Sequence, residues 1–252
     1  MSAVLRLEQV SLKATGTGEL ILRDLSLTVN EGDRLAIVGP SGSGKTHLLR
    51  LFNRLSETSA GSVFYRKQDI TAIPVRQLRQ KVALVLQESR LLGMTVQETL
   101  TYPLKLQGMP KATSQQRMMH WLERLHFPME WMDSREGELS VGQRQWVAIA
   151  RCLMLEPDVL LLDEPTAALD VGRGDALIRL LCDRTLPSPT TVLMVTHQLD
   201  LAEQFCSRMV YVKQGQIVSD LSAKEADWQD IHQDLLETER REAEQWEDPD
   251  WS

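Results

Sequence analysis

The sequence predicts an α/β fold with a mainly parallel sheet, an N-terminal antiparallel β subdomain and an inserted α-helical subdomain. Short, uninterrupted apolar runs are typical of strands buried on both faces of a parallel sheet. Alternating apolar and polar residues near the N-terminus favour antiparallel strands, and helical periodicity separates two of the apolar runs. With 252 residues, 42% of them hydrophobic, the chain is long enough to bury a sizeable core.

The antiparallel strands are predicted at the two ends of the chain. "LRLEQVSL" (5–12) and "LILRDLSLTV" (20–29) alternate in strand fashion, with "GTGE" near the turn between them. "MVYVKQGQIV" (209–218) is typical of a hairpin, which we expect to turn at Gln214 and Gly215.

Four apolar runs predict the parallel strands: 35–38, 82–86, 159–162 and 191–195. Ligands of open α/β sheets bind beyond the carboxyl ends of the strands, so the residues that follow these runs are the candidates for chemistry. They are 39–46, Gln87, Asp163 with Glu164, and His197.

The inserted helical subdomain lies between the second and third runs. Apolar residues from Met118 to Leu125 repeat at helical spacing behind a possible N-cap at Ser114. We therefore expect a helical subdomain at about 88–157, inside a domain that covers 1–221, with an acidic tail over 222–252.

Charge is distributed unevenly. The formal net charge is −7, which argues against nucleic-acid binding because affinity for phosphate backbones requires clustered Lys and Arg. Eleven acidic side chains against two arginines give residues 225–252 a charge of −9, which leaves +2 for the rest of the chain. Such acidic stretches favour a solvated face or disorder. Trp228, Trp246 and Trp251 keep docking against the body or a partner open as the alternative.

Cysteine usage and hydropathy indicate the cellular compartment in which the protein works. Cys152, Cys182 and Cys206 lack the paired spacing of a zinc or redox site, so we interpret them as buried, free residues. No segment has the pattern of a signal peptide or the length of a membrane span. We expect a cytosolic protein that lies on the inner face of the cell membrane only through a partner.

The segment "GPSGSGKT" (39–46) fits the phosphate-binding pattern G-x-x-x-x-G-K-[ST] between a strand and a helix. Glycines let backbone N–H groups face phosphate oxygens, and the positive end of the following helix adds to the attraction. Lys45 would reach the β and γ phosphates, and the Thr46 hydroxyl would coordinate magnesium. The loop consists of Gly39, Pro40, Ser41, Gly42, Ser43, Gly44, Lys45 and Thr46.

Two carboxylates follow the third apolar run. Asp163 would be costly to bury without a cation, so we expect it to face magnesium, through a water. Glu164 is placed to polarise an attacking water as a general base. The alternative is an acidic pair that stabilises a helix start.

His197 and Gln87 are weaker candidates on their own. A single histidine after a strand is more often a hydrogen-bonded structural residue. Both gain weight because each follows a buried strand at the edge where the nucleotide is expected.

The segment "LSVGQ" (139–143) resembles a second anion site. Ser140 is a good N-cap, Gly142 allows close backbone approach, and a helix over 141–154 would present free N–H groups to an anion. An ordinary capped helix remains the alternative. Because one phosphate loop is already complete, a second anion site would serve a nucleotide held by a second copy of the chain.

Taken together, "GPSGSGKT", Gln87, "LSVGQRQ", "VLLLDEP", "AALD" and "VTH" resemble, in this order, the nucleotide-binding subunit of an ABC transporter. The resemblance covers about residues 4–220 and implies a P-loop NTPase (RecA-like) core that binds ATP and Mg²⁺. It also implies a head-to-tail homodimer. Each ATP then lies between one subunit's phosphate loop and the other's signature segment, which is "LSVGQ" (139–143) in this chain.

The resemblance assigns roles by position. It implies that Glu164 is the catalytic base, that His197 orients the γ-phosphate and water, and that Gln87 senses magnesium and a membrane partner. The residues it places against the partner's nucleotide are Ser140, Gly142 and Gln143 at the γ-phosphate, and Asp170 of "AALD" across the interface.

Three positions depart from the family pattern. Val141 stands where glycine is usual, so the backbone there must suit a β-branched residue. Ala14 stands near the position of the usual adenine-stacking aromatic residue, and Trp146 stands where Arg is frequent.

The sequence therefore predicts an ATPase that powers a separate transmembrane permease, with features similar to metal or iron export ATPases. The alternatives are the ATPase of a small-solute importer, a lipoprotein extractor, a soluble ABC ATPase of DNA repair or translation, and a P-loop GTPase or kinase. The sequence has no base-reading "NKxD" segment, which argues against a P-loop GTPase or kinase. It also has no long coiled-coil insertion, which argues against a soluble ABC ATPase of DNA repair or translation.

Overall fold

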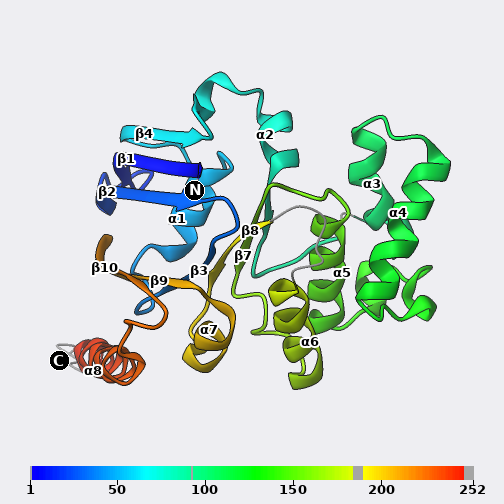
Figure 1. Cartoon of the computed structure of the whole chain (residues 1–252). Helices are drawn as coiled ribbons and strands as arrows, with labels where there is room; N and C mark the ends of the chain where they lie inside the picture. Colours follow the sequence, from blue (N-terminus) through cyan, green and yellow to red (C-terminus); the bar gives the residue numbers. More distant parts are fainter. Residues whose placement is uncertain (1, 92, 184–189, 247–252) are drawn as a thin grey trace.

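A computed structural model describes residues 2–91, 93–183 and 190–246 of the chain. Two sheets and the helices packed around them form the molecule, with the antiparallel sheet on one side and the inserted helices on the other (Figure 1). The predicted α/β class is confirmed.

The smaller sheet is antiparallel and has the strand order β2-β1-β4-β5. Its N-terminal strands pair as the alternating sequence pattern predicted. Their buried side chains form one apolar core together with α1 and one face of the larger sheet. The bounds are β1 Ala3–Lys13, β2 Leu20–Asn30, β4 Ala60–Tyr65 and β5 Gln68–Asp69.

The larger sheet has the strand order β10-β9-β3-β8-β7-β6, and every pair except β9 with β10 is parallel. The four apolar runs form β3, β6, β7 and β8, and the predicted hairpin forms β9 and β10. The bounds are β3 Arg34–Val38, β6 Val82–Val85, β7 Val159–Asp163, β8 Thr191–Val195, β9 Arg208–Lys213 and β10 Gln216–Ser222.

Packed elements cover both faces of β3, β7 and β8, which is why these central strands are apolar. A second core on the face opposite α1 joins the sheet to the inserted helices. The helices outside the insertion are α1 Lys45–Phe52, α2 Val75–Lys81, α6 Val171–Cys182 and α7 Leu199–Phe205, with a 3₁₀ turn at Ile70–Ala72.

Between β6 and β7 the chain is helical. It forms α3 Val96–Leu106, α4 Lys111–Arg124 and α5 Val141–Leu153, with 3₁₀ turns at Met129–Trp131 and Glu136–Glu138. The predicted N-cap at Ser114 is wrong. α4 starts at Lys111 behind Pro110, whose fixed φ suits a helix entry. Ser114 is instead buried inside α4, and its Oγ has no partner in the described structure.

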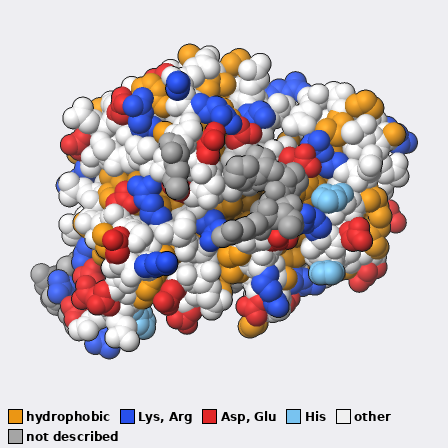
Figure 2. Space-filling view, viewed as in Figure 1, with side chains coloured by type: hydrophobic (Ala, Val, Ile, Leu, Met, Phe, Trp, Pro, Cys, Tyr) orange, Lys and Arg blue, Asp and Glu red, His pale blue; other side chains and the backbone are white. Residues whose placement is uncertain are grey.

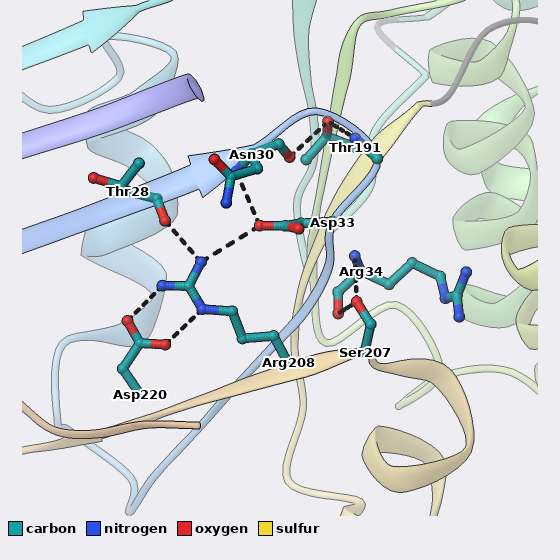
Figure 3. Close-up of polar contacts among 9 residues, drawn as sticks. Thr28, Asn30, Asp33, Arg34, Thr191, Ser207, Arg208 and Asp220 are labelled. Atoms are coloured by element: carbon teal, nitrogen blue, oxygen red, sulfur yellow. Dashed lines mark hydrogen bonds and ion pairs between the residues drawn. The ribbon is translucent and has the colours of Figure 1, made fainter. Parts of the chain in front are cut away.

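One arginine joins the two sheets (Figure 3). Arg208 on β9 binds both carboxylate oxygens of Asp220 on β10, at 2.6 and 2.5 Å. Its third nitrogen donates to the Thr28 carbonyl of β2 at 2.8 Å and lies 3.4 Å from the Asp33 carboxylate. Arginine suits this role because its planar fork satisfies several acceptors at once.

Residues 228–246 of the C-terminal segment form a docked helix, so the prediction of disorder is wrong for these residues, whereas the predicted solvated acidic face is present on the outer side of the helix. α8 spans Trp228–Trp246 and buries Ile231 and Leu235 against the body. Tyr211 and Lys213 of β9 donate to the Asp234 carboxylate, the lysine at 2.7 Å. Acidic side chains gather on the outer side of α8, at the lower left of Figure 2. The side chain of Trp246 and all of Trp251 lie outside the described residues.

The cysteines are free. Cys152 and Cys206 are buried as predicted, whereas Cys182 is partly exposed. Among the described helices, none combines the length and the apolar character needed to cross a lipid bilayer.

The Asp234 contacts give a testable prediction for α8. Lys213 and Tyr211 hold the pKa of Asp234 below its usual range. The docking free energy from this carboxylate is therefore complete above the unfolded pKa and is lost as pH falls through the lowered folded pKa. Asp234→Ala should weaken docking by about 1 kcal/mol, a value kept small because the pair is partly exposed. Hydrogen exchange of 228–238 measures it. His232→Ala, at an exposed position of the same helix, should leave exchange unchanged.

Candidate functional site

A cavity of about 440 Å³ opens at the carboxyl ends of β3, β7 and β8. Residues that follow four different strands meet there, as the sequence predicted for an open parallel sheet. The cavity is lined by Ile21, Ser41, Gly42, Gly44, Lys45, Thr46, His47, Gln87, Glu164, Val195 and His197.

The phosphate loop turns its polar groups toward this cavity. Gly44, with φ of 99°, caps α1, and α1 starts at Lys45. The Lys45 side chain is buried, and its Nζ donates to the carbonyls of Gly39 at 2.8 Å and Pro40 at 2.6 Å. Ser43 Oγ lies 3.4 Å away from the same Nζ. A buried ammonium beside a helix N-terminus makes this wall strongly attractive to phosphate groups.

Thr46 and Asp163 form the candidate magnesium site. Thr46 Oγ1 donates to Asp163 Oδ1 at 3.0 Å. Asp163 is only 3% exposed, and burial raises the pKa of its carboxyl although the Thr46 hydrogen bond opposes this. A hydroxyl and a desolvated carboxylate are the hard oxygen ligands that Mg²⁺ prefers. These residues therefore fit the ion.

Glu164 is buried beside the same cavity in an unusual backbone conformation. Its φ is 47°, in the left-handed region that non-glycine residues seldom adopt, and its N–H donates to Val195 O at 3.0 Å. Burial raises the pKa of Glu164 to about 7. Oε1 is buried and accepts no hydrogen bond from the described residues, although His197 Nε2 lies 3.1 Å away, within ion-pair distance. A carboxylate with such a pKa suits proton transfer near neutral pH.

His197 and Gln87 face the cavity from its more open side. The backbone N–H of His197 lies 3.4 Å from Glu164 Oε2, and its side chain is 46% exposed. Gln87 follows β6 and is exposed to solvent. Neither residue is buried in the core, so both remain accessible to a bound ligand.

The signature residues lie outside this cavity. Ser140 and Gln143 form a capping box at the start of α5, with Ser140 N–H donating to Gln143 Oε1 at 2.7 Å and Gln143 N–H to Ser140 Oγ at 3.2 Å. The predicted N-cap is confirmed. Val141 is the first helical residue, with 59% of its side chain exposed, so its backbone suits a β-branched residue as expected.

The starts of α5 and α6 are packed together. A Cβ at Gly142 would lie 2.4 Å from the Ala168 carbonyl oxygen, so only glycine permits this approach. Asp170 caps α6 by accepting from Arg173 N–H at 2.9 Å, and its side chain is 59% exposed. The four residues assigned to a partner's nucleotide therefore lie at two adjacent helix starts that do not line the cavity of their own chain.

Sequence reasoning missed three residues of the cavity, Ile21, His47 and Val195. His47 follows Thr46 directly, which was the available signal. Burial lowers the pKa of its imidazole, and Nδ1 has no hydrogen-bond partner among the residues that the structure covers. Ala14 does not line the cavity, and Trp146 is a buried core residue.

Comparison with known proteins decides the family. A family model described as "ABC transporter" matches residues 22–167. The chain belongs to the ABC transporter family.

Solved cassettes share the fold of this ABC family member. The dimeric post-hydrolysis state of the ATP-binding cassette MJ0796 bound to ADP and Pi has a TM-score of 0.79 and 28% identity, over 87% of this chain and 98% of that chain. The cbiO1 protein of Clostridium perfringens, part of the ABC transporter complex cbiONQ, has a TM-score of 0.79 and 26% identity, over 95% and 97%.

The names of two sequence relatives refer to amino-acid transport. The methionine import ATP-binding protein MetN 1 of Bacillus cereus is 36% identical over 81% of this chain and 60% of its own length. The general L-amino acid transport ATP-binding protein AapP of Rhizobium johnstonii is 37% identical over 79% and 78%. The chain thus spans about 60% of the length of the MetN relative. These names do not support the expected likeness to metal or iron export.

The Gly142 contact leads to a prediction. Gly142→Ala should destabilise the fold by about 1 to 3 kcal/mol, because the new methyl group overlaps a backbone oxygen. Urea unfolding measures the change. Gly137→Ala is the matched control, since a Cβ there meets no atom within 4 Å. Equal stability of the two variants would contradict the proposed close approach.

Proposed function

We propose that this chain hydrolyses ATP and uses the reaction to drive a separate membrane permease. The observation that carries the proposal is a pair of buried carboxylates beside the phosphate loop: Asp163 accepts a hydrogen bond from Thr46, and Glu164 lines the same cavity as the loop. Desolvated acids of this kind are stabilised by a cation and a bound water, which a magnesium nucleotide provides.

Each side chain has a specific task in this proposal. Lys45 exchanges its two loop carbonyls for phosphate oxygens, and the start of α1 donates further N–H groups to them. Thr46 and Asp163 hold Mg²⁺, which neutralises phosphate charge, and Gln87 approaches it from the open side. Glu164 accepts the proton of the attacking water, and His197 orients that water and the γ-phosphate.

We further propose that hydrolysis requires a head-to-tail homodimer. The cavity of one chain has an open side, and the signature residues of the same chain lie elsewhere. The capped start of α5, with free N–H groups and the positive end of its dipole, would close the cavity of a second copy. Asp170 would cross the same interface. The dimeric form of the MJ0796 cassette supports this arrangement.

The permease would dock on the inserted helices and on the segment after Gln87. Leu86, and Tyr102 and Leu106 one turn apart on α3, are exposed apolar side chains. Exposed apolar groups of this size favour a protein contact. Attachment of this kind would place the chain on the inner face of the membrane.

For the cargo we propose an amino acid, taken up rather than exported. The support is the names of the relatives, which describe methionine import and general L-amino acid transport. Uptake of radiolabelled amino acids by vesicles that contain the chain and its permease tests this. Accumulation of a metal ion but of no amino acid would contradict it.

Glu164→Gln tests the catalytic assignment. Loss of the general base should lower ATP hydrolysis by about 10² to 10⁴-fold, with ATP affinity retained. Phosphate release and nucleotide binding are measured separately, and an ATP-dependent dimer should accumulate on size exclusion. Hydrolysis at the parent rate would remove Glu164 from its role.

Ser140→Arg tests the shared site. The bulky cation replaces the N-cap of α5, so the partner's nucleotide cannot be enclosed, whereas each monomer keeps its own cavity. ATP affinity of the monomer should persist while hydrolysis and dimerisation are lost. Gln115→Arg, an exposed position on α4, is the matched control and should behave as the parent does. Loss of monomer binding in Ser140→Arg would argue against a shared site.

A further inference from the structure

Three consecutive residues after Gln87 are bonded to α5 or to the turn that precedes it. Ser89 Oγ lies 2.7 Å from Gln145 Oε1, and Arg151 Nη1 donates to Arg90 O at 3.3 Å. The backbone N–H of Leu91 donates to Glu136 Oε2 at 3.1 Å. Residues 89–91, called the strap here, therefore tie the segment that carries Gln87 to the helix that begins with the signature.

The turn before α5 is held to the strap side by further bonds. Arg135 Nη1 donates to Gly93 O at 3.0 Å, directly after the strap. Arg144, on the first turn of α5, donates to Leu139 O at 2.7 Å and approaches Glu136 O at 3.4 Å. Ser140 thus starts a helix whose entry is fixed to the segment after Gln87.

The Ser89–Gln145 contact is the buried centre of this connection. Gln145 is 1% exposed, and its Nε2 has no partner within the described parts of the chain. Ser89 Oγ also lies 3.3 Å from Leu86 O. In the alternative amide orientation of Gln145, its Nε2 donates to Ser89 Oγ, which then donates to Leu86 O. A buried amide requires such partners, because an unmade hydrogen bond there is costly.

We propose that Ser89 and Gln145 are positioning residues whose contact fixes the signature start of α5 relative to Gln87 of the same chain before a second copy binds. This inference rests on the proposed function above. Gln87 lines the cavity, and Gln145 lies on α5 five positions after its N-cap, Ser140. When Gln87 and the start of α5 are held in fixed relative positions before the dimer forms, the entropic cost of dimer closure is lower.

The test uses ATP-dependent dimerisation in a Glu164→Gln background, followed by size exclusion across a series of ATP concentrations. Ser89→Ala and Gln145→Leu should each raise the ATP concentration for half-maximal dimer by about two- to tenfold, the effect of one lost hydrogen bond. ATP affinity of the dilute monomer should not change, which separates positioning from general loss of structure.

Two controls sharpen the test. Ser114→Ala removes a buried hydroxyl of the same helical insertion that has no partner, so it should dimerise as the parent does. Ser89→Thr keeps the hydroxyl and should restore the parent's ATP requirement. The double variant Ser89→Ala/Gln145→Leu should shift no further than the larger single variant, because both remove one contact.

The outcomes separate this inference from the function on which it rests. Dimerisation of Ser89→Ala at the parent's ATP concentration, or shifts of the two single variants that simply add, would overturn the role of the pair. A parent that stays monomeric at saturating ATP would overturn the proposed function and this inference with it.

Discussion

The site depends on two neighbouring carboxylates, Asp163 and Glu164, that are buried at the end of β7. Burial raises the pKa of both Asp163 and Glu164, and Glu164 is held there by a left-handed backbone conformation. Natural proteins keep such strained and desolvated acids where a ligand relieves the cost. The phosphate loop beside the cavity provides a positive wall, and the magnesium nucleotide that we propose is a ligand that fits both features.

The same geometry supports the proposal that one copy of the chain is insufficient for hydrolysis. Parallel strands gather the phosphate loop, the carboxylates and His197 at one sheet edge. The start of α5, which has the same chemistry for binding an anion, is built into a different part of the surface. A second copy can bring this helix start to the open side of the cavity. Within each chain, the strap links the segment that carries Gln87 to α5.

Local pattern was sufficient to predict four buried parallel strands and the residues that follow them, because such a strand requires a continuous apolar run, but it did not predict β4 and β5. It was insufficient where contacts between residues far apart in the sequence determine the local structure. The left-handed conformation of Glu164, the docking of α8 through Asp234 and the burial of Ser114 all depend on distant partners. The helix start predicted at Ser114 was wrong for a local reason, because α4 begins at Lys111, directly behind Pro110.

The central claim is that two copies complete each catalytic site. Its most direct test is the rate of ATP hydrolysis per molecule of the isolated chain, measured over a wide range of protein concentrations at saturating Mg-ATP. The account predicts that the rate per molecule falls steeply on dilution, as the dimer dissociates. A rate per molecule that stays constant down to concentrations at which the chain is monomeric would contradict it.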